Sequence, residues 1–203
     1  MIALIDYGVG NLFSLHSSFA ALGIETVVTA DPAVVREAER VVLPGVGAFG
    51  DAAEKLAAAG MDQAVVEAAK AGKPLLGICL GMQLLFDVSY EYGTFRGLSL
   101  IPGAVRPIRE KIPADLKIPH IGWNALHFTK PSPLFRYIKE GDHVYFVHSF
   151  AADLNEATVA TAEYGAPLVA AVEKDNVFGC QFHPEKSGPV GLSILRAFCE
   201  VPV

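Results

Sequence analysis

The strongest constraint on the fold is an alternation, through the first half of the chain, of short β-branched runs with longer alanine-rich stretches. Parallel strands need a crossover of a dozen or more residues, and a helix is the usual crossover. The alternation therefore predicts a parallel sheet wrapped by helices, an α/β arrangement. We expect strands at 1–6, 24–28, 40–43 and 74–78, and helices at 11–22, 49–71 with a break near Gly60, and 80–86.

The pattern changes after about Ser99, where strand-like segments follow one another closely. They are 104–108, 121–128, 143–148, 158–163, 168–173 and 177–182, followed by a last helix over 190–199. Close succession favours antiparallel pairing, so we predict an antiparallel β layer added to the parallel sheet. With no repeat, no long linker and 52% apolar residues, residues 1–203 are expected to form a single domain around one core.

Charge and hydropathy exclude several classes of partner. Sixteen Lys and Arg stand against 22 Asp and Glu, giving a net charge of −6 without blocks of one sign. We therefore expect no nucleic-acid and no membrane partner. The apolar start of the chain meets Asp6, and about 18 apolar residues never run together, so neither a secretory leader nor a membrane span is predicted. The protein is expected to be soluble and cytoplasmic.

Three widely spaced cysteines suit neither a disulfide framework nor a zinc site, so we expect no bound metal. Cys79 stands apart because it lies between Gly77 and Gly81, where an expected strand becomes a helix. This is the sequence of a nucleophile elbow, whose sharp turn leaves no room for Cβ atoms two residues before and after the nucleophile. The alternative for Cys79 is a small buried hydrophobe, which is also the role expected of Cys180 and Cys199.

A thiolate nucleophile needs an imidazole to share its proton, and His183 is the best placed of the six histidines. Glu185 follows two residues later and can accept the Nδ1 proton of His183 across the stiff link made by Pro184. A His-x-Glu pair also arises by chance. Together with the cysteine elbow, however, it predicts a Cys79-His183-Glu185 catalytic triad.

Acyl transfer also needs N–H donors for the oxygen that becomes negative. The backbone amide of Leu80, next to the nucleophile, is one candidate, and the loop 43–50 offers a second near Val46 or Gly47. The alternative for this loop is a plain turn from strand to helix. A second glycine signal, at Gly8 and Gly10, does not fit a dinucleotide-binding fingerprint because Phe13 stands where Gly or Ala is required, so no nucleotide cofactor is expected.

The segments 77–83 (GICLGMQ) and 183–185 (HPE) resemble the class I, triad-type glutamine amidotransferases. Further segments are similar to the glutaminase subunits of imidazole glycerol phosphate synthase within that family. These are IDYGVGNL (5–12), LPGVG (43–47), PHIGWN (119–124), YFVHSF (145–150) and HPEKS (183–187). The motifs run in order over nearly the whole chain.

The resemblance implies a flavodoxin-like class I glutamine amidotransferase fold and a glutaminase that passes ammonia to a cyclase subunit, a (β/α)8 barrel, in a heterodimer. That enzyme forms imidazole glycerol phosphate and a purine precursor in histidine biosynthesis, and its glutaminase is stimulated by the nucleotide bound to the cyclase. By the same resemblance, glutamine is held by Gly45, Gln83, His148, Ser149 and Phe150. Residues Asn11, Trp123 and Lys186 match positions that face the cyclase; Trp123 in the core and Lys186 as a solvated charge are the alternatives.

Two positions depart from the pattern of the family that the chain resembles: Ile121 stands where relatives often have Met, and Phe150 where they often have Tyr. Both exchanges keep the shape of the side chain, and the second loses a hydroxyl. A glutaminase for another synthase, of anthranilate, guanylate or pyridoxal phosphate, remains an alternative, although those families usually have a Pro-Gly-Gly loop where this chain has Pro44-Gly45-Val46-Gly47. A catalytically silent module on the same fold is another.

Overall fold

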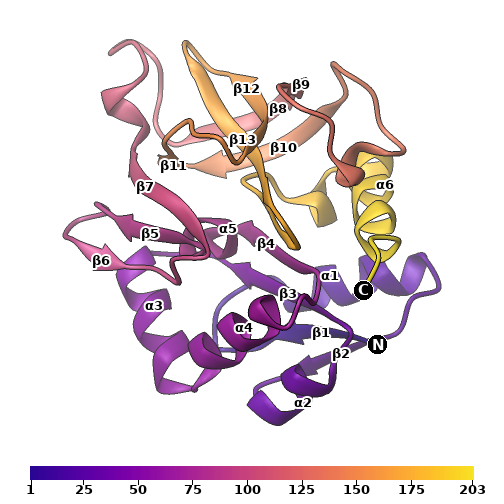
Figure 1. Cartoon of the computed structure of the whole chain (residues 1–203). Coiled ribbons are helices and arrows are strands. Elements are labelled where there is room, and N and C mark those ends of the chain that lie inside the picture. The colour runs from indigo at the N-terminus through magenta and orange to yellow at the C-terminus, as the bar shows by residue number, and fades with distance from the viewer.

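The computed structural model describes residues 1–203, and its centre is an eight-stranded mixed sheet (Figure 1). From one edge to the other the strands are β2 (Thr26–Thr29), β1 (Ile2–Ile5), β3 (Arg40–Gly45), β4 (Leu75–Cys79), β14 (Val177–Cys180), β13 (Pro167–Lys174), β12 (Thr158–Glu163) and β9 (His127–Phe128). Neighbours from β2 to β14 pair in parallel, and those from β14 to β9 pair antiparallel. The predicted α/β fold is confirmed, and the order 2-1-3-4 at its parallel end is that of flavodoxin-like sheets.

Helices cover both faces of the parallel part of the sheet. They are α1 (Leu12–Ala21), α2 (Pro32–Glu37), α3 (Phe49–Ala58), α4 (Met61–Lys70), α5 (Leu80–Leu84) and α6 (Gly188–Cys199). Side chains of α2, α3 and α4 share one apolar cluster with Val41 and Leu43 of β3. Those of α1 and α6 share a second cluster with Val42. Alternate residues of one strand thus pack against opposite helical layers, which explains the continuous apolar run of β3.

Two smaller sheets hold the other strands; in Figure 1 one lies above the parallel strands and the other extends down their left side. One pairs β8 (His120–Ala125) with β10 (His143–His148), and the other has the order β11 (Phe150–Ala152), β7 (Ile101–Pro107), β5 (Phe86–Ser89) and β6 (Phe95–Arg96). Three short 3-10 helices, η1 (Ile108–Glu110), η2 (Pro133–Phe135) and η3 (Pro184–Lys186), complete the chain. The antiparallel strands therefore extend the main sheet and also form separate ribbons beside it.

Several elements differ from the sequence prediction. The helix expected over 80–86 ends at Leu84, because Phe86 begins β5 and pairs with Ile101 of β7. The strand expected to reach residue 182 ends at Cys180, so the segment before His183 leaves the sheet. The short elements α2, β5, β6 and β11 were not predicted, although Asp31 caps α2 in the usual way. The predicted helix break does occur, at Gly60, which has φ of 66°.

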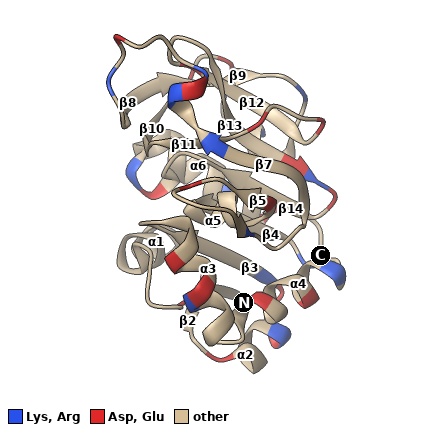
Figure 2. Cartoon of the chain, turned by 90° about the vertical axis from the view of Figure 1, so that its left-hand side faces the viewer, with Lys and Arg blue, Asp and Glu red and all other residues tan.

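The charged residues are distributed over both layers. Figure 2 shows Lys and Arg interspersed with Asp and Glu and no face of one sign in that view. No helix combines the length and apolar character that crossing a bilayer would require.

A substitution at Gly81 can test how much the close contact between α5 and β3 contributes to stability. A Cβ atom at Gly81 would lie 1.8 Å from the carbonyl oxygen of Leu43, so Gly81→Ala forces backbone apart and should lower the free energy of unfolding by at least about 3 kcal/mol. The matched control is Gly141→Ala, where φ is 88° but nothing lies within 4 Å of the added atom. Gly141→Ala should lower the free energy of unfolding by only about 1 to 2 kcal/mol, because an alanine is held in a left-handed backbone conformation. Urea unfolding measures both, and equal losses would show that the contact is unimportant.

Candidate functional site

Cys79 ends strand β4 at the carboxyl edge of the parallel sheet and is followed immediately by α5. Its backbone has φ of 55° and ψ of −112°, a strained conformation for a residue with a side chain. Such strain persists only where the surroundings enforce it, and here β4 is bonded on one side to β3 and on the other to β14. Cys79 is 8% exposed, and it lies at the edge of the sheet where an apolar cluster ends.

The two glycines beside Cys79 are required by contacts that the structure shows directly. A Cβ atom at Gly77 would lie 2.7 Å from the carbonyl oxygen of Gly81, and one at Gly81 would meet the Leu43 oxygen of β3. Cβ atoms do not approach other atoms so closely. The geometry of the predicted elbow is therefore present, and its glycines allow α5 to fold back over β3 and β4.

His183 is brought to this elbow from the far end of the sequence. It lies between β14 and η3, and its backbone N–H donates to the carbonyl oxygen of Tyr145 on β10 at 2.9 Å. The hydroxyl of Ser187 donates to the His183 carbonyl at 2.6 Å and accepts from the Tyr145 N–H at 3.0 Å. Two of these hydrogen bonds tie the histidine segment to β10, and the third, within the segment, holds His183 to Ser187.

The imidazole of His183 lies between a carboxylate and the sulfur. Its Nδ1 is 2.8 Å from Oε1 of Glu185, and the ring lines the same cavity as Cys79, near enough for the thiol to shift the pKa of His183. Burial lowers the pKa of His183, but the hydrogen bonds to Cys79 and Glu185 outweigh it and raise the pKa to about 9. At neutral pH the ring is therefore an imidazolium.

Glu185 is almost fully enclosed, with 1% of its side chain exposed. Its second carboxylate oxygen, Oε2, has no hydrogen-bond partner within the protein. Its negative charge is therefore balanced mainly by the imidazolium of His183. This fits an orienting carboxylate that holds Nδ1–H and leaves Nε2 towards the sulfur.

A cavity of about 310 Å³ opens at the elbow. It is lined by Val46, Gly47, Cys79, Leu80, Gln83, Glu91, Pro119, Val147, His148, Ser149, Phe150 and His183. The thiol and the imidazole thus share one concave site with the segments 46–47 and 147–150. Its size is at the lower end for small-molecule sites, which suits an amino acid.

The three residues expected to supply N–H donors, Val46, Gly47 and Leu80, all line this cavity beside Cys79. Gly47 has φ of 96°, a conformation open to glycine, and Val46 is 42% exposed. The loop is held from behind by Tyr7, whose hydroxyl donates to the Pro44 carbonyl at 2.8 Å. Sequence reasoning gave Tyr7 no role, although its place at the end of the first strand was a signal for it.

Of the residues expected to hold glutamine, Gln83, His148, Ser149 and Phe150 line the cavity and Gly45 does not. Gly45 lies behind it, where a Cβ atom would be 2.8 Å from both the Gly81 nitrogen and the Tyr7 hydroxyl. The Gln83 amide is already engaged, since Nε2 donates to the Phe150 carbonyl and to Gln181 Oε1, each at 3.0 Å. Gln181, which sequence reasoning missed, in turn places its Nε2 3.8 Å from the Cys79 sulfur.

Glu91 is a second cavity residue that sequence reasoning missed. It is 8% exposed, and its Oε2 accepts from the backbone N–H of Phe49 at the start of α3 at 2.8 Å. Burial raises its pKa, the hydrogen bond from Phe49 opposes the shift, and the charge of Asp51 adds to it. A carboxylate held in this way can pair with an ammonium group. Only the tertiary structure places it there, because its sequence neighbours, Tyr90 and Tyr92, belong to a surface loop.

The residues expected at a partner interface lie outside the cavity but near one another. Trp123 on β8 is 53% exposed and contacts Tyr145 edge to face at 6.0 Å between ring centroids. The Lys186 ammonium lies 5.9 Å from the centre of the same Tyr145 ring. Asn11 caps α1, which packs beside η3, where Lys186 lies. Trp123 is therefore not a core residue.

The other two cysteines are in apolar surroundings. Cys180 on β14 is fully buried and Cys199 on α6 is partly buried. Burial raises the pKa of Cys180 far above the usual range and that of Cys199 to about 11. Both stay protonated thiols at neutral pH, so neither is expected to react selectively. No group of three or more His, Cys, Asp or Glu side chains is arranged to hold a metal ion.

Comparison with known proteins gives concordant results. The profile of the family described as Glutamine amidotransferase class-I matches residues 3–201. The chain is 51% identical over 202 residues to the imidazole glycerol phosphate synthase subunit HisH of Geobacter metallireducens, covering 97% of this chain and 96% of that one. It is 47% identical over 204 residues to the HisH subunit of Wolinella succinogenes, covering 99% and 100%. A solved structure described as a glutamine amidotransferase superimposes with a TM-score of 0.76 at 18% identity, covering 98% of each chain.

The charge of His183 gives a testable pH dependence. Its folded pKa of about 9 lies above the unfolded value of about 6.5, so protonation of His183 stabilises the folded protein fully below about pH 6.5, and this stabilisation is lost as pH rises through about 9. Glu185→Gln removes the carboxylate and should lower the His183 pKa by at least about 1 unit.

NMR titration of the His183 ring measures the shift, and urea unfolding between pH 6 and pH 9 should show a smaller pH dependence in the variant. The matched control is Glu163→Gln, an exposed glutamate elsewhere in the chain. An unchanged His183 titration in Glu185→Gln would show that the carboxylate does not hold the ring charge.

Proposed function

This chain belongs to the class I glutamine amidotransferase family, and within it to the imidazole glycerol phosphate synthase HisH subunits, and we propose that it hydrolyses glutamine through Cys79 and supplies the ammonia to a cyclase. The main support for this proposal is that Cys79 and His183 line one cavity and that the His183 ring is hydrogen-bonded to Glu185. Residues 1–203 act together in this proposal as one glutaminase domain.

In the first half of the reaction the Cys79 thiolate attacks the carboxamide carbon of glutamine. Electrons move onto the carboxamide oxygen, and N–H groups of Leu80 and of the loop at Val46 and Gly47 stabilise the resulting anion. The imidazolium of His183 then donates its Nε2 proton to the departing nitrogen. The carbon–nitrogen bond breaks, ammonia leaves, and a glutamyl thioester remains on Cys79.

In the second half His183, now neutral, accepts a proton from water as the water attacks the thioester. The carbon–sulfur bond breaks, glutamate is released, and the thiolate and imidazolium are restored. Glu185 keeps its hydrogen bond to Nδ1 throughout and stabilises each imidazolium stage. The pKa of about 9 for His183 means that the acid form needed for the first half is present at neutral pH.

Glutamine carries an ammonium and a carboxylate besides its carboxamide, and the cavity has complementary groups. The Glu91 carboxylate, enclosed and fixed by the Phe49 N–H, is suited to pair with the ammonium. The backbone of 148–150 and the side chain of Gln83 form the opposite wall. In this arrangement the carboxamide lies at Cys79 and the amino-acid end lies towards Glu91.

The proposed partner is the cyclase subunit, a (β/α)8 barrel, in a heterodimer. Ammonia released into water at neutral pH is mostly protonated and no longer nucleophilic, so a dry passage between the subunits is needed. The neighbouring residues Asn11, Trp123 and Lys186 are proposed to face the cyclase, with Trp123 as an exposed aromatic anchor. The net charge of −6 fits a protein partner rather than nucleic acid.

Sequence identity favours this function over that of a glutaminase for another synthase. The chain is about half identical to HisH subunits over its length, whereas the solved glutamine amidotransferase shares the fold at 18% identity. The three triad side chains are also in contact, which disfavours a catalytically silent module.

Covalent trapping tests the nucleophile. A glutamine analogue with a chloromethyl ketone in place of the carboxamide should label Cys79 once per chain, because only that thiol lies in the cavity beside an imidazolium. Peptide mass spectrometry locates the label. Cys199→Ser is the matched control and should be labelled like the wild type, whereas Cys79→Ser should not be labelled. Modification of Cys180 or Cys199 instead would remove Cys79 from the mechanism.

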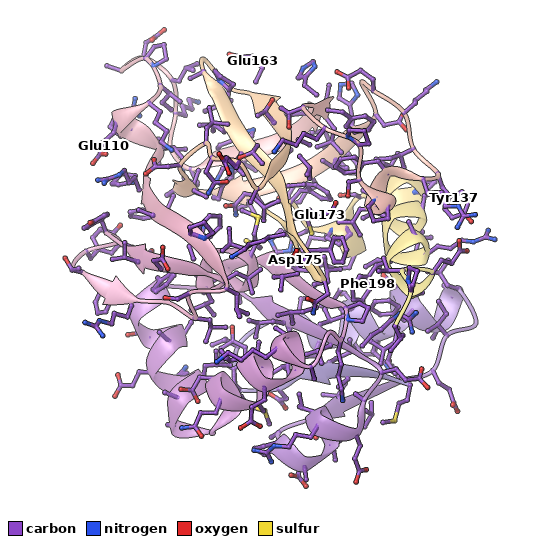
Figure 3. All side chains as sticks on the ribbon, viewed as in Figure 1. Glu110, Tyr137, Glu163, Glu173, Asp175 and Phe198 are labelled. Carbon is purple, nitrogen blue, oxygen red and sulfur yellow. The ribbon has the colours of Figure 1, made fainter.

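The partner proposal predicts that the isolated chain hydrolyses glutamine slowly. Adding the cyclase of the same organism with its nucleotide substrate should raise the turnover number at least about tenfold, equivalent to about 1.4 kcal/mol of barrier. Trp123→Ala should weaken the complex at least about tenfold, the usual effect of losing an aromatic anchor. Tyr137→Ala is the control, since this exposed aromatic lies beside α6 (Figure 3) and should leave affinity unchanged. Full turnover without the cyclase would contradict the proposal.

A further inference from the structure

The inner face of the β8–β10 ribbon carries two imidazole rings that take no part in the proposed bond-making steps. His120 and His148 stand opposite each other in the strand register and are 1% and 6% exposed. His120 Nδ1 lies 2.9 Å from His148 Nε2, and the His120 ring stacks between Phe146 and Tyr164 at centroid distances of 5.1 and 4.2 Å. Each of their four ring nitrogens is buried in a setting where it needs a hydrogen-bond partner.

The carbonyl group of Phe150 sets the direction of these hydrogen bonds. His148 Nδ1 lies 2.8 Å from that oxygen, which can only accept, so Nδ1 of His148 carries the hydrogen. Burial lowers the pKa of both rings, and that of His148 to about 4, so near pH 7 His148 is neutral and its Nε2 has a lone pair. His120 must therefore donate from Nδ1 to His148 Nε2.

The side-chain amide of Asn124 is the outermost group of this hydrogen-bonded series. It can bond to His120 whether that ring is neutral or protonated. It lies 2.7 Å from His120 Nε2 and 3.0 Å from the Glu163 carbonyl oxygen. With its oxygen towards His120, it accepts from an imidazolium; turned over, it donates to a neutral ring and leaves the Glu163 carbonyl to water. Glu163 is an exposed residue at the outer end of β12 (Figure 3), whereas Phe150 is buried. The Phe150 carbonyl, at the buried end, therefore determines which atom donates in each of these hydrogen bonds, because water cannot replace a lost partner there.

The inner end meets the catalytic cavity. The Phe150 carbonyl receives its second hydrogen bond from Gln83 Nε2 at 3.0 Å, so both of its lone pairs are used. His148 and Phe150 also line the cavity with Cys79. We call the hydrogen-bonded series Asn124, His120, His148 and the Phe150 carbonyl the imidazole relay. It fixes one cavity wall from the side opposite to α5.

We propose that His120 is a positioning residue of the glutamine site: by donating Nδ1–H to His148 Nε2, it keeps His148 Nδ1–H on the Phe150 carbonyl and holds the wall formed by residues 148–150. This deepens the proposed function and rests on it. The relay also links the cavity to β8, whose opposite face exposes Ile121 and Trp123, 57% and 53% exposed, where the cyclase is proposed to dock. A displacement of β8 on docking would reach the glutamine site through His120.

Two substitutions of His120 separate hydrogen bonding from packing. His120→Phe keeps an aromatic ring between Phe146 and Tyr164 but has no donor. His120→Asn loses the stacking but places an amide N–H close to the position of Nδ1. His143→Phe, at an exposed position on the same two strands, is the matched control. His120→Leu replaces His120→Phe if the phenylalanine variant does not fold.

The first readout is the exchange of the His148 Nδ1 hydrogen with water, followed by NMR in the full chain without glutamine. The wild type, His143→Phe and His120→Asn should retain this hydrogen, whereas in His120→Phe the ring is held at one nitrogen only and exchange should be about tenfold faster, as expected for the loss of one hydrogen bond. The second is glutaminase kinetics of the complex with the cyclase. His120→Phe should raise KM for glutamine about tenfold, with alkylation of Cys79 by iodoacetamide, which has no amino-acid group, unchanged.

Wild-type exchange of the His148 hydrogen and a wild-type KM in His120→Phe would overturn the proposal, and so would equal losses in His120→Asn and His120→Phe, because stacking would then be the role of His120. If the wild-type complex itself fails to hydrolyse glutamine, the proposed function is lost. The exchange experiment still tests the relay in that case, because it requires no turnover.

Discussion

The close contact between α5 and the end of β3 is the constraint on which the site depends. Gly81 lies against the Leu43 carbonyl with no space for a side chain, and Gly77 lies against the backbone of α5. This packing forces Cys79 into a strained conformation with φ of 55° and directs its thiol out of the sheet. It also places the Leu80 amide and the loop at Val46 beside the sulfur. The nucleophile and its proposed N–H donors are thus products of one packing arrangement.

The second half of the chain supplies the rest of the site through strand pairing. Because β14 pairs in parallel with β4, the chain leaves the sheet at Cys180 beside the elbow, and His183 follows immediately. Ser187 and Tyr145 then fasten the histidine segment to β10, and β10 brings His148 and the wall of the cavity with it. The antiparallel ribbon therefore has three structural roles: it anchors His183, forms one wall of the cavity and exposes Trp123.

Electrostatics couples these parts. The imidazolium of His183 is stabilised by Glu185 and the sulfur against the unfavourable effect of burial, whereas the neighbouring His148 is kept neutral by burial and by the charge of His183. Two histidines in one cavity thus differ in charge at neutral pH. The protonated ring of His183 can donate a proton, and the neutral ring of His148 holds a backbone carbonyl. Residue type does not distinguish them; their hydrogen-bond partners do.

Local sequence determined the parallel α/β half and the elbow, because alternating apolar runs and the Gly-x-Cys-x-Gly spacing are short-range signals of burial and of a tight turn. Local sequence also indicated His183 and Glu185 as candidate site residues, because they are only two residues apart. It could not place Glu91, Gln181, Tyr7 or His120, whose roles come from contacts with β-strands and loops distant in the sequence. Nor did it predict that α5 would end at Leu84, since pairing of Phe86 with β7 overrides the helical pattern. Tertiary structure decided these points because hydrogen-bond partners and desolvation depend on which segments meet in space.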